Sequence, residues 1–101
     1  MTVTAATQVN NKRRTNFFLE PIEPNPFRKQ AKIKINLPYR TRVTVLITNA
    51  YGKVVDKMVS ITHNAGFYEL EFYAEELPRG TYFCHVVADD FSESKEMELT
   101  K

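Results

Sequence analysis

The amino-acid sequence predicts an all-β protein, an Ig-like antiparallel sandwich of two sheets with about seven short strands. Stretches in which apolar and polar residues alternate recur about every 10–13 residues along the chain. No stretch between them is long enough for the helix that a parallel crossover requires. The chain has one cysteine, so the sandwich is expected to lack an internal disulfide.

The first strand is expected at residues 17–22, where Pro21 cannot donate a ladder hydrogen bond and therefore favours a sheet edge. Residues 24–26, Pro-Asn-Pro, predict a stiff extended crossing, because each proline fixes its own φ and pushes the preceding residue to an extended conformation. Alternation is clear at residues 30–37 and 42–48. The residues expected to face the core here are Ile33, Ile35, Leu37, Val43, Val45 and Ile47.

Glycine marks the turns in the second half of the chain, because it accepts positive φ at little cost. A single helical turn is expected at residues 74–77, ended by Pro78. Cys84 is expected to point inward as a small core residue. The strands expected here are residues 53–59, 67–73, 81–88 and 94–100.

Residues 1–16 are rich in Thr, Asn and Gln, show no periodicity and include the basic triplet Lys12-Arg13-Arg14, so a disordered leader is expected. Residues 17–101 are then one domain of common size. The chain has no apolar run of about 18 residues, which predicts no membrane insertion. No signal peptide follows Met1, which implies a cytoplasmic location if Met1 is the native start.

Charge is divided between the two halves of the chain. Residues 28–57 carry eight Lys or Arg against one acid, a net of +7, and residues 69–98 carry nine acids against two bases, a net of −7. This predicts neighbouring strands with Lys32 and Lys34 opposite Glu69 and Glu71, each pair contributing roughly 0.2–1 kcal/mol. The alternative is a dipolar surface that steers a partner. Nucleic acid is not expected to bind, because the basic stretch would be neutralised within the molecule.

No residues in the sequence suggest a catalytic, cofactor-binding or metal site, so the protein is expected to be neither an enzyme nor a holder of a cofactor. His63 and His85 have no Asp or Ser at a spacing that suggests a proton relay. One cysteine and two histidines in different elements do not make a zinc site, and Asp89-Asp90 supplies too few ligands for calcium. No Gly-rich phosphate loop is present.

Six short motifs occur in order along the chain. They are Pro24-Asn25-Pro26, Leu37-Pro38, Val43 to Ile47, Gly52 to Val55, Gly80-Thr81-Tyr82 and the closing segment Lys95 to Lys101. In this order they resemble the C-terminal sorting domain of the type IX secretion system of Bacteroidetes, the Por secretion family. The resemblance covers residues 17–101. A weaker one relates the chain to the Ig-like domain of flagellar hook-capping proteins.

The resemblance implies a non-catalytic sorting or anchoring domain that is recognised by the secretion machinery of the outer membrane. It implies passage from the periplasm to the cell surface or the extracellular space, with the machinery proteins as partners. The domain itself is expected to be a monomer. The residues that it implicates in recognition are Pro24, Asn25, Pro26, Gly52, Lys53, Gly80, Tyr82, Lys95, Met97, Leu99 and Lys101.

Two other functions remain open at this point. One is a stand-alone Ig-like structural or protein-interaction module without a sorting role, which would associate with copies of itself through its first or last edge strand. The other is an intracellular binding module, which takes the missing signal peptide at face value.

Overall fold

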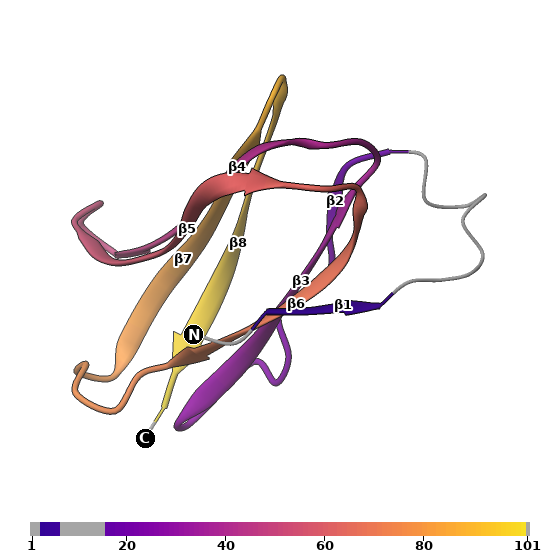
Figure 1. Cartoon of the computed structure of the whole chain (residues 1–101). Coiled ribbons are helices and arrows are strands. Elements are labelled where there is room, and N and C mark those ends of the chain that lie inside the picture. Colours follow the sequence, from indigo (N-terminus) through magenta and orange to yellow (C-terminus); the bar gives the residue numbers. More distant parts are fainter. Residues whose placement is uncertain (1–2, 7–15, 101) are drawn as a thin grey trace.

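The protein, described by a computed structural model at residues 3–6 and 16–100, consists of two four-stranded antiparallel sheets packed face to face (Figure 1). One sheet has the strand order β1-β6-β3-β2 and the other the order β5-β4-β7-β8. The chain passes between the sheets after β3, after β5 and after β6. The strands are β1 (Val3–Ala6), β2 (Phe18–Leu19), β3 (Gln30–Leu37), β4 (Thr41–Asn49), β5 (Val54–His63), β6 (Gly66–Tyr73), β7 (Gly80–Ala88) and β8 (Phe91–Leu99).

The structure confirms the predicted all-β sandwich of two antiparallel sheets without a disulfide. Strands β2 to β8 lie at the seven predicted positions. Where a helical turn was expected after β6, the backbone forms a tight turn in which the Leu77 N–H donates to the Ala74 carbonyl at 3.3 Å. Among the described residues, no helix is long and apolar enough to cross a membrane.

The structure differs from the expected disordered leader at residues 3–6, which form β1 and pair with the outer edge of β6. An unpaired strand edge offers its backbone N–H and C=O groups to any extended segment. Backbone pairing of this kind needs no apolar periodicity in the added strand, which explains why periodicity did not indicate it. The rest of the leader that was expected at 1–16 lies outside the described residues, apart from Asn16.

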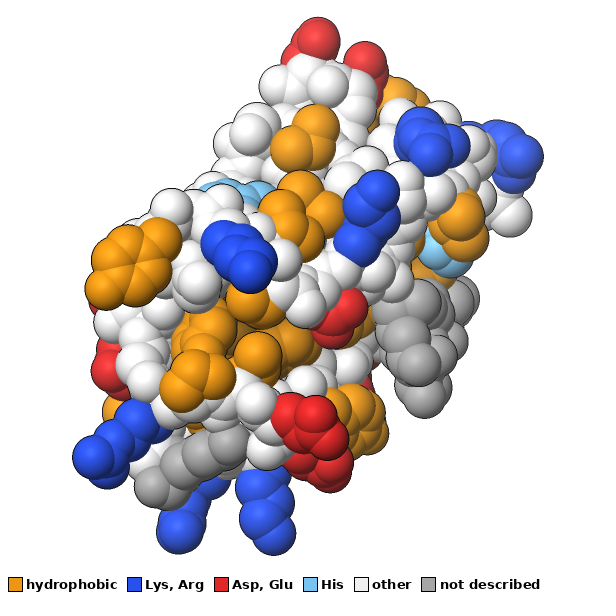
Figure 2. All heavy atoms as spheres, turned by 90° about the vertical axis from the view of Figure 1, so that its left-hand side faces the viewer, with side chains coloured by type: hydrophobic (Ala, Val, Ile, Leu, Met, Phe, Trp, Pro, Cys, Tyr) orange, Lys and Arg blue, Asp and Glu red, His pale blue; other side chains and the backbone are white. Residues whose placement is uncertain are grey.

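The opposite charges of the two halves meet in the sheet that contains β3 and β6, as predicted. Lys32 lies opposite Glu71 and Lys34 opposite Glu69, and the Lys32 Nζ is 3.3 Å from the Glu69 Oε2 on the diagonal. Both side chains are partly exposed, so the pair contributes about 0–1 kcal/mol. On the side of the molecule that carries the β4–β5 turn, charges of both signs surround a central group of hydrophobic side chains (Figure 2).

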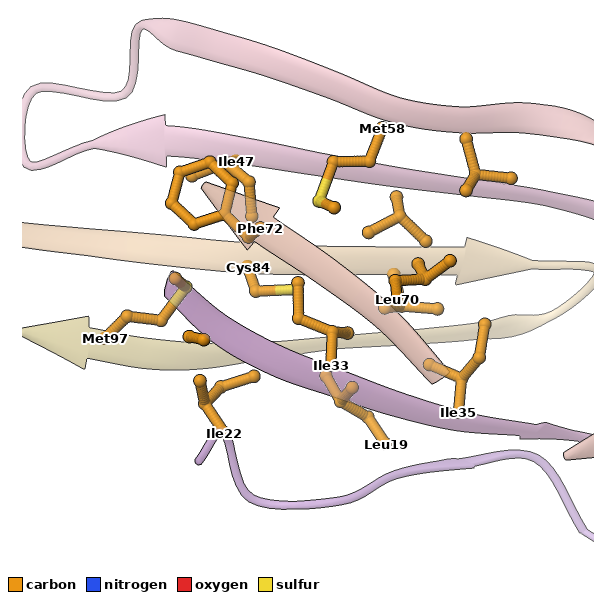
Figure 3. Packing of buried hydrophobic residues seen from close by; sticks show 14 of the residues in the cluster. Leu19, Ile22, Ile33, Ile35, Ile47, Met58, Leu70, Phe72, Cys84 and Met97 are labelled. Carbon is orange, nitrogen blue, oxygen red and sulfur yellow. The ribbon is translucent and has the colours of Figure 1, made fainter. Parts of the chain in front are cut away.

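The core lies between the two sheets (Figure 3). Ile33 and Leu70 project from one sheet toward Ile47 and Cys84 of the other. Cys84 therefore faces aliphatic side chains, as expected for a small core residue. Each large apolar side chain buried in this way contributes roughly 1.5–3 kcal/mol. All six residues of β3 and β4 that were predicted to face the core are buried.

Burial raises the pKa of the Cys84 thiol to about 12. The folded-state pKa lies above the unfolded value of about 8.5, so the stabilisation of the neutral thiol is complete below that pH and is lost as the pH rises toward 12. We expect Cys84 to resist a thiol reagent at pH 8 in the native protein and to react rapidly in denaturant. We also expect Cys84→Ala to flatten the fall in unfolding free energy between pH 8 and pH 11. Rapid labelling of the native protein would contradict this placement.

Candidate functional site

The strands β2 and β3 belong to the same sheet, but the loop that connects them reaches across to the other sheet and lies along the outer edge of β8, on the side away from β7. Phe27 forms a parallel bridge with Leu99. Its N–H donates to the Glu98 carbonyl at 2.8 Å, and its carbonyl accepts from the Thr100 N–H at 2.8 Å and from the Thr100 Oγ1 at 3.2 Å. A single residue thus continues the sheet beyond its last strand.

Asn25 extends this pairing with its side chain. The Asn25 Nδ2 donates to the Glu96 carbonyl at 3.0 Å, and the Asn25 Oδ1 accepts from the Glu98 N–H at 2.9 Å. A carboxamide has the donor and acceptor of a peptide group, so Asn25 replaces one residue of a neighbouring strand. The prolines on either side have no N–H to satisfy, which suits them to the outermost position of a sheet. We refer to residues 24–27 as the edge segment.

Phe27 anchors the edge segment in the core. Its side chain is 0% exposed, and its ring centroid lies 6.1 Å from that of Phe72 on β6. Sequence reasoning placed Asn25 among the recognition residues but did not include Phe27 or Thr100. The sequence does contain a signal for the role of Phe27, because this large apolar residue stands alone between Pro26 and the charged pair Arg28-Lys29.

Gly80 and Tyr82 lie beside the same end of β8, since Gly80 pairs with Leu99 and Tyr82 pairs with Met97. The Tyr82 hydroxyl donates to the Pro78 carbonyl at 2.6 Å, and burial raises the Tyr82 pKa. Gly80 has φ +145°, a conformation that side chains rarely adopt, at the point where the loop enters β7. These residues shape the loop beside the end of β8.

The same local arrangement occurs once more in the chain, at the start of β6. Gly66 has φ +152°, and the hydroxyl of Tyr68 donates to the Asn64 carbonyl at 2.8 Å. In both cases a Gly-x-Tyr sequence opens a strand, and the tyrosine binds the carbonyl four residues before it. The repetition is visible in the sequence but was not used in the prediction.

Gly52 and Lys53 form the turn between β4 and β5. The Asn49 Oδ1 accepts from the N–H of Tyr51 at 2.9 Å and from that of Lys53 at 3.0 Å, while Gly52 has φ +86°. Because Asn49 pairs with Tyr82, this turn lies at the same end of the sheet as the edge segment. Strands β4 and β7 separate the turn from β8, so Gly52 and Lys53 do not join the site.

The remaining predicted residues divide between the core and the surface. Met97 and Leu99 are 0% and 1% exposed, and they hold the inner face of β8 in the core. Lys95 lies on the same strand, where its Nζ is 3.2 Å from the Glu93 Oε2. Lys101 lies outside the described residues.

The sequence indicated no hydroxyl partner for His85, but the structure places two hydroxyl groups beside its ring. The Ser94 Oγ lies 2.6 Å from the His85 Nδ1, and the Thr48 Oγ1 lies 2.8 Å from the His85 Nε2. Sequence spacing did not indicate this contact, because the β7–β8 hairpin places His85 opposite Ser94. The partner on the other side of the His85 ring, Thr48, offers a hydroxyl rather than the carboxylate that orients a catalytic imidazole. The three side chains link β4, β7 and β8 across the outer face of their sheet.

The family model of the secretion system C-terminal sorting domain matches residues 22–98, about three quarters of the chain. The chain belongs to this family. The match confirms the resemblance to type IX sorting domains, and it includes the edge segment, both Gly-x-Tyr sequences and β8 as far as Glu98. A sorting domain directs its protein to the cell surface or the extracellular space. A search of curated proteins found no match to the chain.

We expect Asn25→Ala to lower the unfolding free energy by about 1–3 kcal/mol, because it removes two hydrogen bonds worth about 0.5–1.5 kcal/mol each. The Glu98 amide should then exchange faster with deuterium, whereas Asn25→Asp keeps the oxygen that accepts from this amide and should protect it better. Asn64→Ala is the matched control, since its side chain accepts from Arg40 at 2.6 Å far from β8. Unchanged Glu98 exchange in Asn25→Ala would contradict the described pairing.

For the loop before β7, we expect Tyr82→Phe to cost about 0.5–1.5 kcal/mol through loss of the bond to Pro78. Tyr68→Phe removes the equivalent bond at β6 and should cost a similar amount. Urea unfolding of both variants measures the two values. A neutral effect of both substitutions would show that the Gly-x-Tyr arrangement contributes no stability.

Proposed function

We propose that this sorting domain is a non-catalytic signal, recognised by the type IX machinery of the outer membrane through β8 and the edge segment together. The observation that supports the proposal is the pairing itself. Residues 25–27 and 96–100 are far apart in the sequence, yet hydrogen bonds hold them side by side on one edge of the sandwich. A receptor that contacts this edge would contact the edge segment and the end of β8 at the same time.

Exposure divides the motif residues into two groups. Pro24, Asn25 and Pro26 are exposed, as are Glu96 and Thr100 on the adjoining strand. These residues present the polar and ring surfaces that a receptor could contact. In the proposed division of roles, the buried or turn-forming residues maintain the shape of the edge rather than touch the receptor. That second group consists of Gly80, Tyr82, Met97 and Leu99.

The alternative of a stand-alone module that self-associates through its last strand has less support. The outer edge of β8 is already paired with the edge segment at Glu96, Glu98 and Thr100. A second copy could add a strand there only after displacing these hydrogen bonds. We therefore propose a monomer whose partners are proteins of the secretion machinery.

An export assay tests this function. The complete chain would be fused behind a fluorescent protein that carries a signal peptide, and expressed in a bacterium with the type IX system and in a mutant without it. We expect fluorescence at the surface or in the medium of the first strain only. Periplasmic retention in both strains, with the domain folded by protease resistance, would contradict a sorting role.

Two substitutions in the same assay test the proposed surface. We expect Asn25→Asp and Glu96→Lys each to lower the exported fraction by a factor of about 5 or more, the equivalent of about 1 kcal/mol of lost recognition. Asp90→Lys makes the same charge change as Glu96→Lys at the exposed β7–β8 turn and should leave export unchanged. Equal effects of both lysine substitutions would rule out a specific role for the edge segment.

A further inference from the structure

A shallow groove of about 320 Å³ lies between β5 and the loop that follows β6. Its apolar lining comes from Val55, Phe72 and Leu77, and its acidic lining from Asp56, Glu75 and Glu76. Figure 2 shows the side of the molecule that carries the β4–β5 turn, where acidic and basic side chains both surround a central group of hydrophobic ones. None of these residues was predicted from the sequence to contribute to recognition.

The apolar lining is continuous with the core. Phe72 is 1% exposed, and Val55 and Leu77 are half-buried and pack against the core cluster. An apolar side chain that entered the groove would cover these residues and remove their remaining surface from water. The volume is at the lower end of the roughly 300–1,000 Å³ of small-molecule pockets. It suits one or two side chains of a peptide better than a larger ligand.

Carboxylates stand on both walls of the groove, Asp56 on β5 and Glu75 and Glu76 on the loop. Among the described residues, neither Asp56 nor Glu76 makes an ion pair. The acids do not converge into a group that could hold a metal ion, again within the described part of the chain. Tyr73 adds a half-exposed aromatic ring to the rim, a surface that attracts lysine and arginine.

We propose that this groove binds an extended basic segment of a partner protein, which inserts one apolar side chain and places lysine or arginine beside the flanking carboxylates. Among the described residues these acids form no cluster that could hold a metal ion, and they come from both walls of the groove, which suits charges spaced along a peptide. This surface goes beyond the proposed sorting role, because β5 and β8 lie at opposite edges of their sheet. The groove and the edge segment could therefore engage different partners.

Fluorescence anisotropy with labelled hexapeptides tests the proposal on the complete chain. We expect the peptide GKLRKG to bind, and GELEEG and GKSRKG to bind at least about fivefold more weakly, because each lacks one of the two interactions. Binding of GKLRKG should weaken in 0.5 M salt, since exposed charge pairs are screened. No saturable binding of GKLRKG at millimolar concentration, or equal binding of all three peptides, would overturn the proposal.

Matched substitutions locate the binding on the protein. Asp56→Lys and Glu76→Lys should each weaken GKLRKG binding by about fivefold or more, whereas Asp90→Lys changes the net charge equally at the far end of β7 and should have little effect. Val55→Thr should also weaken binding, with the half-exposed Val87→Thr as its control. If the control substitutions weakened binding as much, then net charge or nonspecific hydrophobic contacts would explain the binding, and the groove proposal would fail. Export of the fusion protein is measured separately, so either proposal can fail alone.

Discussion

The pairing of the edge segment with the outer edge of the last strand is the contact on which this side of the sandwich depends. An edge strand leaves alternate backbone groups without partners, which invites pairing with other chains. Asn25 and Phe27 satisfy these groups from Glu96 to Thr100, and the buried ring of Phe27 keeps them in place. Burial of such a ring is worth roughly 1.5–3 kcal/mol, a large share of the about 5–15 kcal/mol that stabilises a typical domain.

Most of the fold could be predicted because each strand encodes its own inner face. Alternation identified Ile33, Ile35, Val43 and Val45 as core residues, and the division of charge identified the pairing of β3 with β6. The side-chain bonds of Asn25 could not be predicted in the same way. They join residues about 70 positions apart, and no local pattern specifies the register of such a contact.

The contact between His85 and Ser94 was missed for a related reason. Its two residues are close in sequence, but their meeting depends on the exact register of the β7–β8 hairpin, and a shift of one residue would move Ser94 to the other face. Strand β1 lacked a signal of another kind, since its pairing with β6 uses backbone groups that every residue has. The sequence therefore predicts which side chains are buried better than it predicts which residues contact one another.

The hydrogen bonds between Asn25 and β8 join distant parts of the chain. Asn25 and Glu98 are 73 residues apart in the sequence. In topological terms they close a ring without a covalent bond, in a protein whose single cysteine cannot do so. Closing a long loop has an entropic cost that rises slowly with its length, and the two sheets that hold both partners in place offset this cost. The edge also cannot form until residues 96–100 are in place. A completed edge is therefore a physical mark of a chain that has been synthesised through its last strand and has folded.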